Sequence, residues 1–279
     1  MSASSPAGSE NSPRGGLAPG RGMRILQFAL KAGLYAFLVA VPVFLVLPFL
    51  GPGVGTGRGA LRLECLYNLS QIGLALHNYH STHGSFPPAY VTDAQGKPLY
   101  SWRVLILPFL KKDDLYQEFR KDEPWDSPHN LQLVDKMPAV FRCPETPRTA
   151  SQFTSYVGVT GPGTVFAPDK VCRLTDITDG PDKTILIVET AETDIVWTEP
   201  KDLPLASLSF KIDLDHKEIS SRHSPQPMVW NLWAKSPPDG ANAIFCDGHG
   251  RFLSHSIPAD TVRALCTIAG GEHVNEDDF

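Results

Sequence analysis

The chain has 279 residues and a formal net charge of −5 at pH 7, from 25 basic and 30 acidic side chains. This length is enough for one domain with a sizeable core. The acidic balance argues against a nucleic-acid partner, because that binding depends on neutralising phosphates with lysine and arginine. The 5 cysteines form no close pair of the CxxC type, which argues against structural zinc. An exported domain permits disulfides, but the sequence alone does not give their connectivity, and buried free thiols are the alternative.

The N-terminal fifth of the chain is predicted to anchor it in a membrane. Residues 1–22 are mostly serine, glycine and proline, and this composition predicts a disordered tail. Residues 23–50 are predicted to form a transmembrane helix, because Ala32 to Leu50 carries no charge and would span roughly 28 Å as a helix. The alternatives are a buried core helix and a cleaved secretory signal. Arginines before the span place the N-terminus in the cytoplasm and the C-terminal domain in the periplasm, on the outer side of the cytoplasmic membrane.

A glycine-rich stretch and a helical pattern follow the apolar segment. Residues 51–60 are predicted to form a flexible tether that no helix crosses. From Leu61 to about His83, apolar side chains recur every three or four residues, which predicts an amphipathic helix. Gly73 lies within this helix at a cost of about 1 kcal/mol relative to alanine, so we expect another element to pack closely there.

Short helices and then short strands are predicted along the rest of the chain. The helices are expected at Trp102–Leu110 with Ser101 as cap and an interruption at Pro108, Lys112–Phe119, a segment from the Asp126-Ser127-Pro128 cap to Lys136, and Asp260–Ile268. The strands are expected at Ser155–Val159, Thr184–Glu192, Asp194–Thr198, Ala241–Phe245 and Gly250–Ser254.

The order of these elements indicates an α+β fold in which the amphipathic helix packs on an antiparallel β-sheet. Thr184–Glu192 is rich in β-branched residues and is therefore expected at the centre of the sheet. Asp247 and Gly248 stand between the last two strands, and this dipeptide predicts a tight hairpin turn.

Several blocks of the sequence resemble, in the same order, a bacterial envelope family of prepilin-like domains of unknown function. The family signature is a histidine, nine residues and then Asp-Gly. The blocks are Cys65–Pro88, Tyr100–Leu110, Asp122–Asn130, Phe141–Pro144, Leu174–Glu189, Val196–Pro204, Ala243–Leu253 and Thr267–Glu272. The resemblance implies a pseudopilin-like architecture: a membrane helix, an amphipathic helix and an exported α+β domain over residues 61–272, before an acidic tail at 273–279.

The chain departs from the family pattern at two places. Pro237 stands nine residues before Asp247-Gly248, where the family has its histidine. No prepilin cleavage site enters the apolar segment, and the predicted tether interrupts the continuous helix on which pseudopilin filaments depend. We therefore expect a permanently anchored, tethered domain and not a filament subunit. The family-motif residues that are present are Asp179, Gly180, Glu189, Asp247 and Gly248.

Three histidines could ligate a metal. His77, His80 and His83 follow each other at three-residue steps, and neighbours at this spacing share a helix surface. No carboxylate accompanies them in the sequence, and the first and last point about 120° apart. The favoured interpretation is a polar helix end with His77 packed on the sheet.

Carboxylates and tryptophans supply the other candidate sites. Asp179 and Gly180 belong to a loop whose turn pattern explains them better than calcium binding does. Glu189 and Asp247 could form a hydrolase pair if a cleft held them about 5–9 Å apart, but a turn explains Asp247, and backbone groups or Arg103 could satisfy Glu189. Trp197, Trp230 and Trp233 could line a carbohydrate or peptide groove, although core positions are more common for tryptophan.

The sequence therefore predicts a membrane-anchored protein without enzymatic activity or cofactor. Its expected role is structural contact with a protein partner or an envelope polymer outside the membrane. The first alternative is an exported carbohydrate- or peptide-binding module, and the second is a carboxylate-dependent hydrolase. No G-x-S-x-G, H-E-x-x-H, G-x-G-x-x-G or Walker pattern supports an enzyme.

Overall fold

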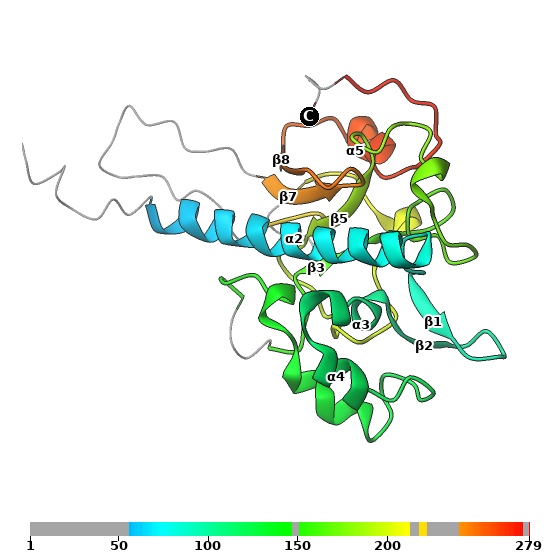
Figure 1. Cartoon of the computed structure of the whole chain (residues 1–279). Coiled ribbons are helices and arrows are strands. Elements are labelled where there is room, and N and C mark those ends of the chain that lie inside the picture. Colours follow the sequence, from blue (N-terminus) through cyan, green and yellow to red (C-terminus); the bar gives the residue numbers. More distant parts are fainter. Residues whose placement is uncertain (1–55, 147–150, 213–217, 222–239, 276–278) are drawn as a thin grey trace, which may run out of the picture. The chain divides into compact units, whose positions relative to one another are not determined.

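A long helix, α2 (Thr56–His83), lies across a four-stranded antiparallel sheet in the computed structural model (Figure 1). The structure describes residues 56–146, 151–212, 218–221, 240–275 and 279, which fall within one compact unit of 54–279. The predicted tail and transmembrane helix lie outside these residues, as do Trp230, Trp233 and Pro237. In the described ranges, no helix is both long enough and apolar enough to span a bilayer.

The amphipathic helix predicted from the apolar spacing is confirmed. Cys65, Leu69, Ile72 and Leu76 recur on one face of α2 and are fully buried against the sheet. The close approach expected at Gly73 is also present, since a Cβ atom placed there would lie 2.9 Å from Ile244 Cγ2 on β7. Glycine is therefore required at this position despite its poor helix propensity.

The predicted tether is wrong over its second half, because α2 already begins at Thr56. Gly57 and Gly59 lie within the helix. Each costs about 1 kcal/mol relative to alanine, but extending a helix that tertiary packing has already nucleated is far easier than starting one. Residues 51–55 lie outside the described chain.

Four strands form the main sheet in the order β3-β5-β7-β8, with every neighbouring pair antiparallel. The central position predicted for Thr184–Glu192 is confirmed, because β5 pairs with both β3 and β7. The strands of this sheet are β3 (Tyr156–Val157), β5 (Ile185–Glu189), β7 (Gly240–Phe245) and β8 (Gly250–Ser254). The predicted hairpin joins β7 to β8, and Gly248 in its turn has a φ of 93°, which favours glycine.

Two smaller sheets flank the main one. β1 pairs antiparallel with β2, and β4 pairs parallel with β6. Their bounds are β1 (Tyr90–Thr92), β2 (Pro98–Ser101), β4 (Val159–Thr160) and β6 (Leu203–Pro204). The strand predicted at Asp194–Thr198 is wrong, since only an isolated bridge between Phe153 and Val196 forms there. The short β-favourable run has no strand beside it long enough to make a ladder.

The remaining helices are short. They are α3 (Trp102–Leu105), α4 (Asp113–Glu118) and α5 (Ala259–Leu265), with 3₁₀ turns at Pro108–Leu110, Asn130–Lys136, Ala139–Phe141, Leu174–Asp176 and Leu205–Ser207. The Ser101 cap is confirmed, because its hydroxyl accepts the backbone N–H of Arg103 at 3.3 Å. The interruption predicted at Pro108 is confirmed, because α3 ends before this proline, which has no N–H to donate to a helix.

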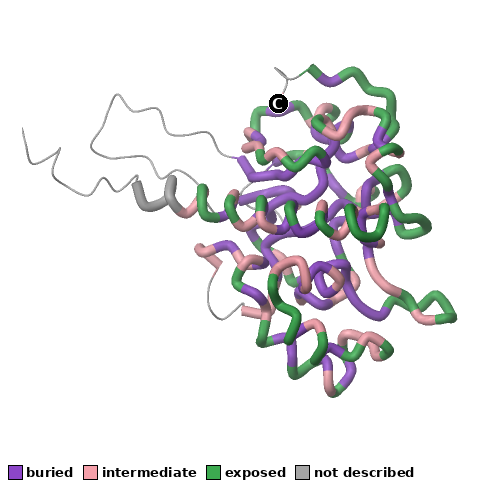
Figure 2. The backbone as a smooth tube through the Cα atoms, viewed as in Figure 1, coloured by how far each residue is buried: buried purple, intermediate pink, exposed green. Residues whose placement is uncertain are grey.

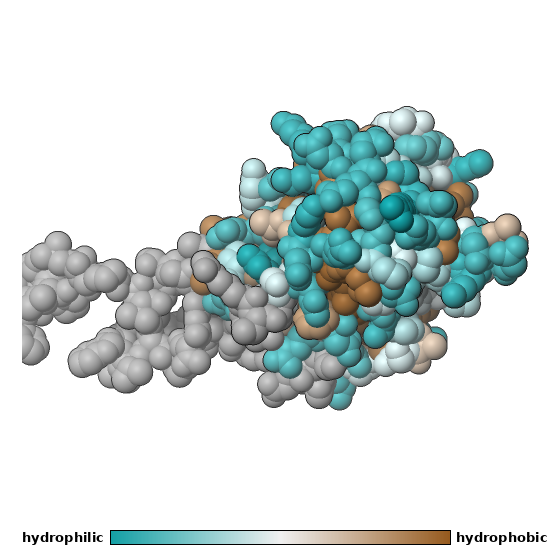
Figure 3. All heavy atoms as spheres, turned by 90° about the horizontal axis from the view of Figure 1, so that it is seen from below, coloured by the Kyte–Doolittle hydropathy of each residue, from teal (hydrophilic) through white to brown (hydrophobic). Residues whose placement is uncertain are grey.

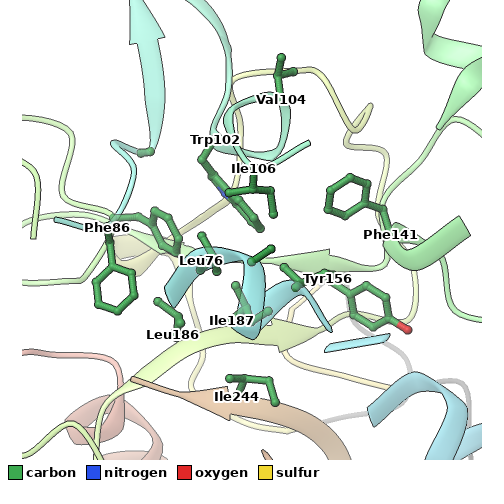
Figure 4. Close-up of a cluster of buried hydrophobic side chains, with 14 of the residues drawn as sticks. Leu76, Phe86, Trp102, Val104, Ile106, Phe141, Tyr156, Leu186, Ile187 and Ile244 are labelled. Atoms are coloured by element: carbon green, nitrogen blue, oxygen red, sulfur yellow. The ribbon is translucent and has the colours of Figure 1, made fainter. Parts of the chain in front are cut away.

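The two faces of the sheet carry separate hydrophobic clusters. One lies between the sheet, α2 and the segment around α3, where Leu76, Trp102, Ile106 and Ile187 gather (Figure 4). The other lies on the far face and includes Val188 and residues of α5. In Figure 2 the strands of the main sheet are largely buried, whereas exposed residues lie mainly in the surrounding loops and on one side of α2. Hydrophilic residues cover most of the face turned toward the viewer in Figure 3.

A bulge in β5 decides which of its side chains face α2. Ile185 pairs with Phe245 while Ile187 pairs with the next residue, Ile244, so Leu186 is the extra residue of the strand. Strict alternation would place Ile185, Ile187 and Glu189 on one face, yet Ile185 belongs to the far cluster and Ile187 to the cluster under α2. The bulge therefore turns Glu189 toward α2.

Candidate functional site

The bulge brings Glu189 beside two cysteines and creates a buried polar cluster, which we call the thiol cluster: Cys65, Cys143 and Glu189. One sulfur or carboxylate oxygen from each lies within 4.8 Å of the others. The three residues are 0%, 2% and 1% exposed, respectively. They are the one set of three histidine, cysteine or acidic residues in the described ranges with the proximity that a metal ion needs.

Each member of the thiol cluster is positioned by a different element. Cys65 occupies the buried stripe of α2, at helical spacing from Leu69. Cys143 follows the 3₁₀ turn at Ala139–Phe141, and its backbone N–H donates to the Ser155 hydroxyl at 3.0 Å. Glu189 closes β5. Because these elements are far apart in sequence, only the tertiary fold assembles the cluster.

Amide donors and one arginine compensate the buried charge of Glu189. Its Oε2 accepts the side-chain amide of Asn242 at 2.9 Å and the backbone N–H of the same residue at 3.3 Å. Burial lowers the pKa of Arg62, and the Glu189 carboxylate opposes that shift by favouring the charged guanidinium. The guanidinium also lies over the ring of Phe252, 3.1 Å from its centroid.

The surroundings of the thiol cluster keep the Cys65 thiol protonated. A hydrogen bond with the Cys143 thiol, burial and the Glu189 charge together raise the pKa of Cys65 far above its ordinary value. Burial and the neighbouring Cys65 likewise raise the pKa of the Tyr156 hydroxyl. Since the thiolate is the reactive form of cysteine, the folded cluster is a poor nucleophile. Its two sulfur atoms and one carboxylate, within 4.8 Å of one another, are groups that can ligate a metal, and the two sulfurs are also groups that can form a disulfide.

The three histidines of α2 make separate contacts. His77 lies edge-on to Phe86, with centroids 5.5 Å apart, and burial lowers its pKa, followed by the charge of His80, while Asp247 opposes both. His80 Nε2 accepts the Leu174 backbone N–H at 3.3 Å. His83 and Tyr79 stack with centroids 3.9 Å apart. The set of three ligands found in the described residues contains none of these histidines.

An open hollow lies at the C-terminal end of α2. Its volume is about 590 Å³, and its lining combines polar and apolar groups. The lining residues are His80, His83, Gly84, Ser85, Val171, Arg173, Leu174 and Thr175. The hollow shares no residue with the thiol cluster.

The loop residues of the family motif have structural roles. Asp179 accepts the backbone N–H groups of Gly270 and Gly271 at 2.6 and 3.0 Å, which joins its loop to the C-terminal segment. Gly180 has a φ of 106° and so needs the freedom of glycine. Asp247 accepts the backbone N–H of His249 at 3.0 Å, as a turn-forming aspartate does.

The carboxylates of Glu189 and Asp247 do not meet in a cleft. Glu189 is hydrogen-bonded to Asn242 near the start of β7, whereas Asp247 follows the end of that strand. The strand from Asn242 to Phe245 alone corresponds to about 10 Å of extended chain. The suggested partner Arg103 is not bound to Glu189 either, because it pairs with Asp202.

Trp197 belongs to the core. It is fully buried, its indole N–H donates to the Val134 carbonyl at 3.0 Å, and it stacks with Phe141 at a centroid distance of 6.0 Å. A groove that binds carbohydrate needs an exposed ring, so Trp197 does not supply one. Trp230 and Trp233, the other two candidates, lie outside the described residues.

The structure also contains a buried ion pair, Arg103–Asp202, that the sequence does not predict. Arg103 and Asp202 approach to 2.5 Å with both side chains almost fully buried. Asp202 further accepts the Trp102 indole N–H at 3.0 Å and the Gly158 backbone N–H at 2.8 Å. The pair is separated by 99 positions in the chain, so no local pattern could reveal it. An arginine directly after a buried tryptophan is the one weak signal.

The sequence of the chain was compared with protein families, curated proteins and solved structures. Residues 58–260 match the family described as a protein of unknown function, DUF1559 (SBP_bac_10). No curated protein and no solved structure matches the chain.

Proposed function

We propose that this chain, which belongs to DUF1559, a family of proteins of unknown function, is a membrane-anchored interaction protein without enzymatic activity. Its domain lies outside the cytoplasmic membrane and binds a protein partner through the outer face of α2. The predicted anchor at 23–50 supports the membrane location, and the packing of α2 on an antiparallel sheet agrees with a pseudopilin-like architecture.

The observation that carries this proposal is a row of exposed apolar side chains on α2. Leu63, Tyr67 and Leu74 are 67%, 65% and 63% exposed, respectively. Their spacings of four and seven residues place them on one side of the helix, opposite the buried stripe. Scattered apolar residues on a surface need no explanation, but an aligned row indicates an interaction site.

The row has the dimensions of a helix-recognition surface. Eleven residues of helix span about 16 Å, and anchors spaced by four and seven residues are typical of a helix that inserts into an apolar groove. The candidate catalytic groups do not compete with this assignment: Glu189 is buried against Asn242, and Asp247 belongs to a turn. We therefore assign the row to contact with a protein and not to substrate binding.

Site-specific photo-crosslinking in intact cells tests the partner. A benzophenone amino acid replaces Tyr67 on the row, and the matched control replaces Asp114, which is exposed on α4. We expect one discrete protein adduct from position 67, none of that mass from position 114, and loss of the adduct in the Leu63→Ser/Leu74→Ser double variant. Equal labelling at both positions, or labelling that the double variant leaves intact, would contradict the proposal.

Protease treatment of spheroplasts tests the location in the same strains. A C-terminal tag should be digested without lysis, while an N-terminal tag should stay protected and on the full-length chain. Protection of the C-terminal tag would place the domain inside and overturn the proposed topology. Loss of the N-terminal tag with the apolar segment would show a secreted protein instead of an anchored one.

A further inference from the structure

The thiol cluster holds two cysteines that are close in space and far apart in sequence. Cys65 comes from α2, and Cys143 comes from the segment after the 3₁₀ turn at Ala139–Phe141. Their side chains are hydrogen-bonded to each other, and their sulfur atoms lie within 4.8 Å. All five cysteines are buried, and none is bonded to another in the structure.

We propose that Cys65 and Cys143 are joined by a disulfide bond in the exported protein, and that the other three cysteines remain thiols. The bond ties α2 to the segment that precedes β3. This inference rests on the proposed location outside the cytoplasmic membrane, because disulfides form and persist in oxidising compartments.

The contacts of the other three cysteines do not favour a different pairing. Cys172 affects the pKa of Cys246 only through its charge. The Cys172 thiol donates instead to the backbone carbonyl of Arg173 at 3.5 Å. Cys266 belongs to the cluster on the far face of the sheet, where burial alone raises its pKa. The Cys65–Cys143 pair is the one whose thiols are hydrogen-bonded to each other in the described chain.

The reaction is a thiol–disulfide exchange with an oxidised dithiol protein or with oxidised glutathione. One thiolate of the pair attacks a sulfur of that oxidant and forms a mixed disulfide, and one oxidant thiol leaves. The second cysteine then attacks the mixed disulfide, and the other oxidant thiol leaves. Two cysteine thiols are oxidised, the external disulfide is reduced to two thiols, and two protons pass from the cysteines to the departing sulfurs.

The local environment determines when this exchange takes place. In the folded chain both sulfurs are shielded from solvent, and the Glu189 carboxylate disfavours a thiolate at Cys65. The exchange therefore precedes the packing of α2 on the sheet, and the finished bond is shielded from reductants.

Counting alkylated thiols in the purified full-length chain tests the bond itself. The chain is unfolded, refolded with a mixture of oxidised and reduced glutathione, unfolded again without reductant, alkylated and weighed. We expect three alkylated cysteines of the five, and a proteolytic peptide pair that links residues 65 and 143. The Cys143→Ser variant should show four alkylated cysteines, and the matched control Cys266→Ser should show two.

Three results would overturn the proposal. Five alkylated cysteines would show that no bond forms, and a link that includes residue 172, 246 or 266 would show a different pairing. Five alkylated cysteines together with one zinc ion per chain in native mass spectrometry would assign the cluster to metal binding. The wild-type count requires no variant to fold, so the test is independent of the serine variants.

The same count on protein taken directly from cells separates the bond from the location. Cells are quenched in acid with an alkylating reagent before lysis. A link between residues 65 and 143 in vivo supports both the bond and the oxidising compartment. A link that forms with glutathione in vitro but is absent in vivo contradicts the proposed location and leaves the geometry of the pair established.

Discussion

Tyr156 contacts two buried polar clusters that solve the same physical problem in different ways. Its backbone carbonyl accepts hydrogen bonds from Arg103, which belongs with Asp202 to a buried ion pair. Its side chain interacts with Cys65 of the thiol cluster, and its hydroxyl points away from the apolar side chains drawn around it (Figure 4). Both clusters are sealed from water, yet their polar atoms are satisfied to different degrees.

The ion pair is complete in itself. The Arg103 guanidinium also donates to the Ser101 hydroxyl at 2.8 Å, and Asp202 accepts from a backbone amide and an indole besides Arg103. Beside the thiol cluster, by contrast, Oδ1 of Asn242, the residue that donates to Glu189, has no hydrogen-bond partner among the described residues. A buried charge pair whose hydrogen bonds are all made has a structural role. The stability of a cluster that leaves polar atoms unsatisfied depends instead on the chemical state of its groups, thiol or disulfide.

The largest expected effect comes from breaking the ion pair. Asp202→Ala leaves the fully buried Arg103 guanidinium without its countercharge, and we expect a loss of about 3–5 kcal/mol in the free energy of unfolding. Urea denaturation of the full-length chain measures this loss.

Two comparisons identify the cause of that loss. Replacing both partners, as Arg103→Met/Asp202→Leu, should destabilise the chain less than the single change, because no unpaired charge remains. Glu118→Ala is the surface control, since Glu118 and Lys136 pair at 2.6 Å while half exposed, and we expect less than about 1 kcal/mol. An Asp202→Ala variant as stable as that control would show that the pair has no structural role.

Neither cluster could be predicted from the sequence, although the local elements could. The hairpin between β7 and β8 depends on Asp247-Gly248 and on the alternation beside it, so its signal is contained in a few residues. The ion pair and the thiol cluster depend on pairings across 46 to 124 positions. The bulge at Leu186 alone decides the face on which Glu189 lies, and no periodicity in the segment marks it.

The start of α2 was predicted wrongly for a related reason. The glycines before Ala60 reduce helix propensity, which favours a tether from local rules, yet α2 continues through them because its packed part lies on the sheet. Gly73 shows the opposite case, since its local cost correctly indicated a close neighbour. A glycine can therefore be interpreted when it lies within a clear helical repeat, as Gly73 does. Glycines at the end of such a repeat do not show where the helix begins.

A moderate effect is expected from removing the amide that satisfies Glu189. Asn242→Ala deletes the side-chain donor at 2.9 Å from the carboxylate, and leaves a buried charge with less compensation. We expect a loss of about 1–3 kcal/mol in the free energy of unfolding, measured by urea denaturation. Asn78→Ala, at an exposed position of α2, is the control and should stay within about 0.5 kcal/mol. Equal stability of the two variants would mean that Glu189 is satisfied without Asn242.

The smallest expected effect is on the pH dependence of stability, which distinguishes the reduced thiol cluster from the cluster with a disulfide. In the reduced chain, the Cys143 hydrogen bond, burial and Glu189 raise the pKa of Cys65 above the 9.0 of an ordinary cysteine. Above pH 9 the unfolded chain therefore loses a proton that the folded chain keeps, so stability falls as pH rises. The slope is about 1.4 kcal/mol per pH unit for each such thiol.

The oxidised chain should lack this contribution, because a disulfide does not titrate. Urea denaturation between pH 8 and 10, with and without reduction of the unfolded chain before refolding, should therefore show a steeper loss for the reduced form. Burial raises the pKa of Cys266 to about 12, and this thiol contributes equally to both forms. Cys266→Ala should accordingly flatten both curves and leave their difference unchanged. Parallel curves for the reduced and oxidised wild type would show that the fold does not hold the Cys65 thiol protonated. The contrast between the two buried clusters would then have no electrostatic basis.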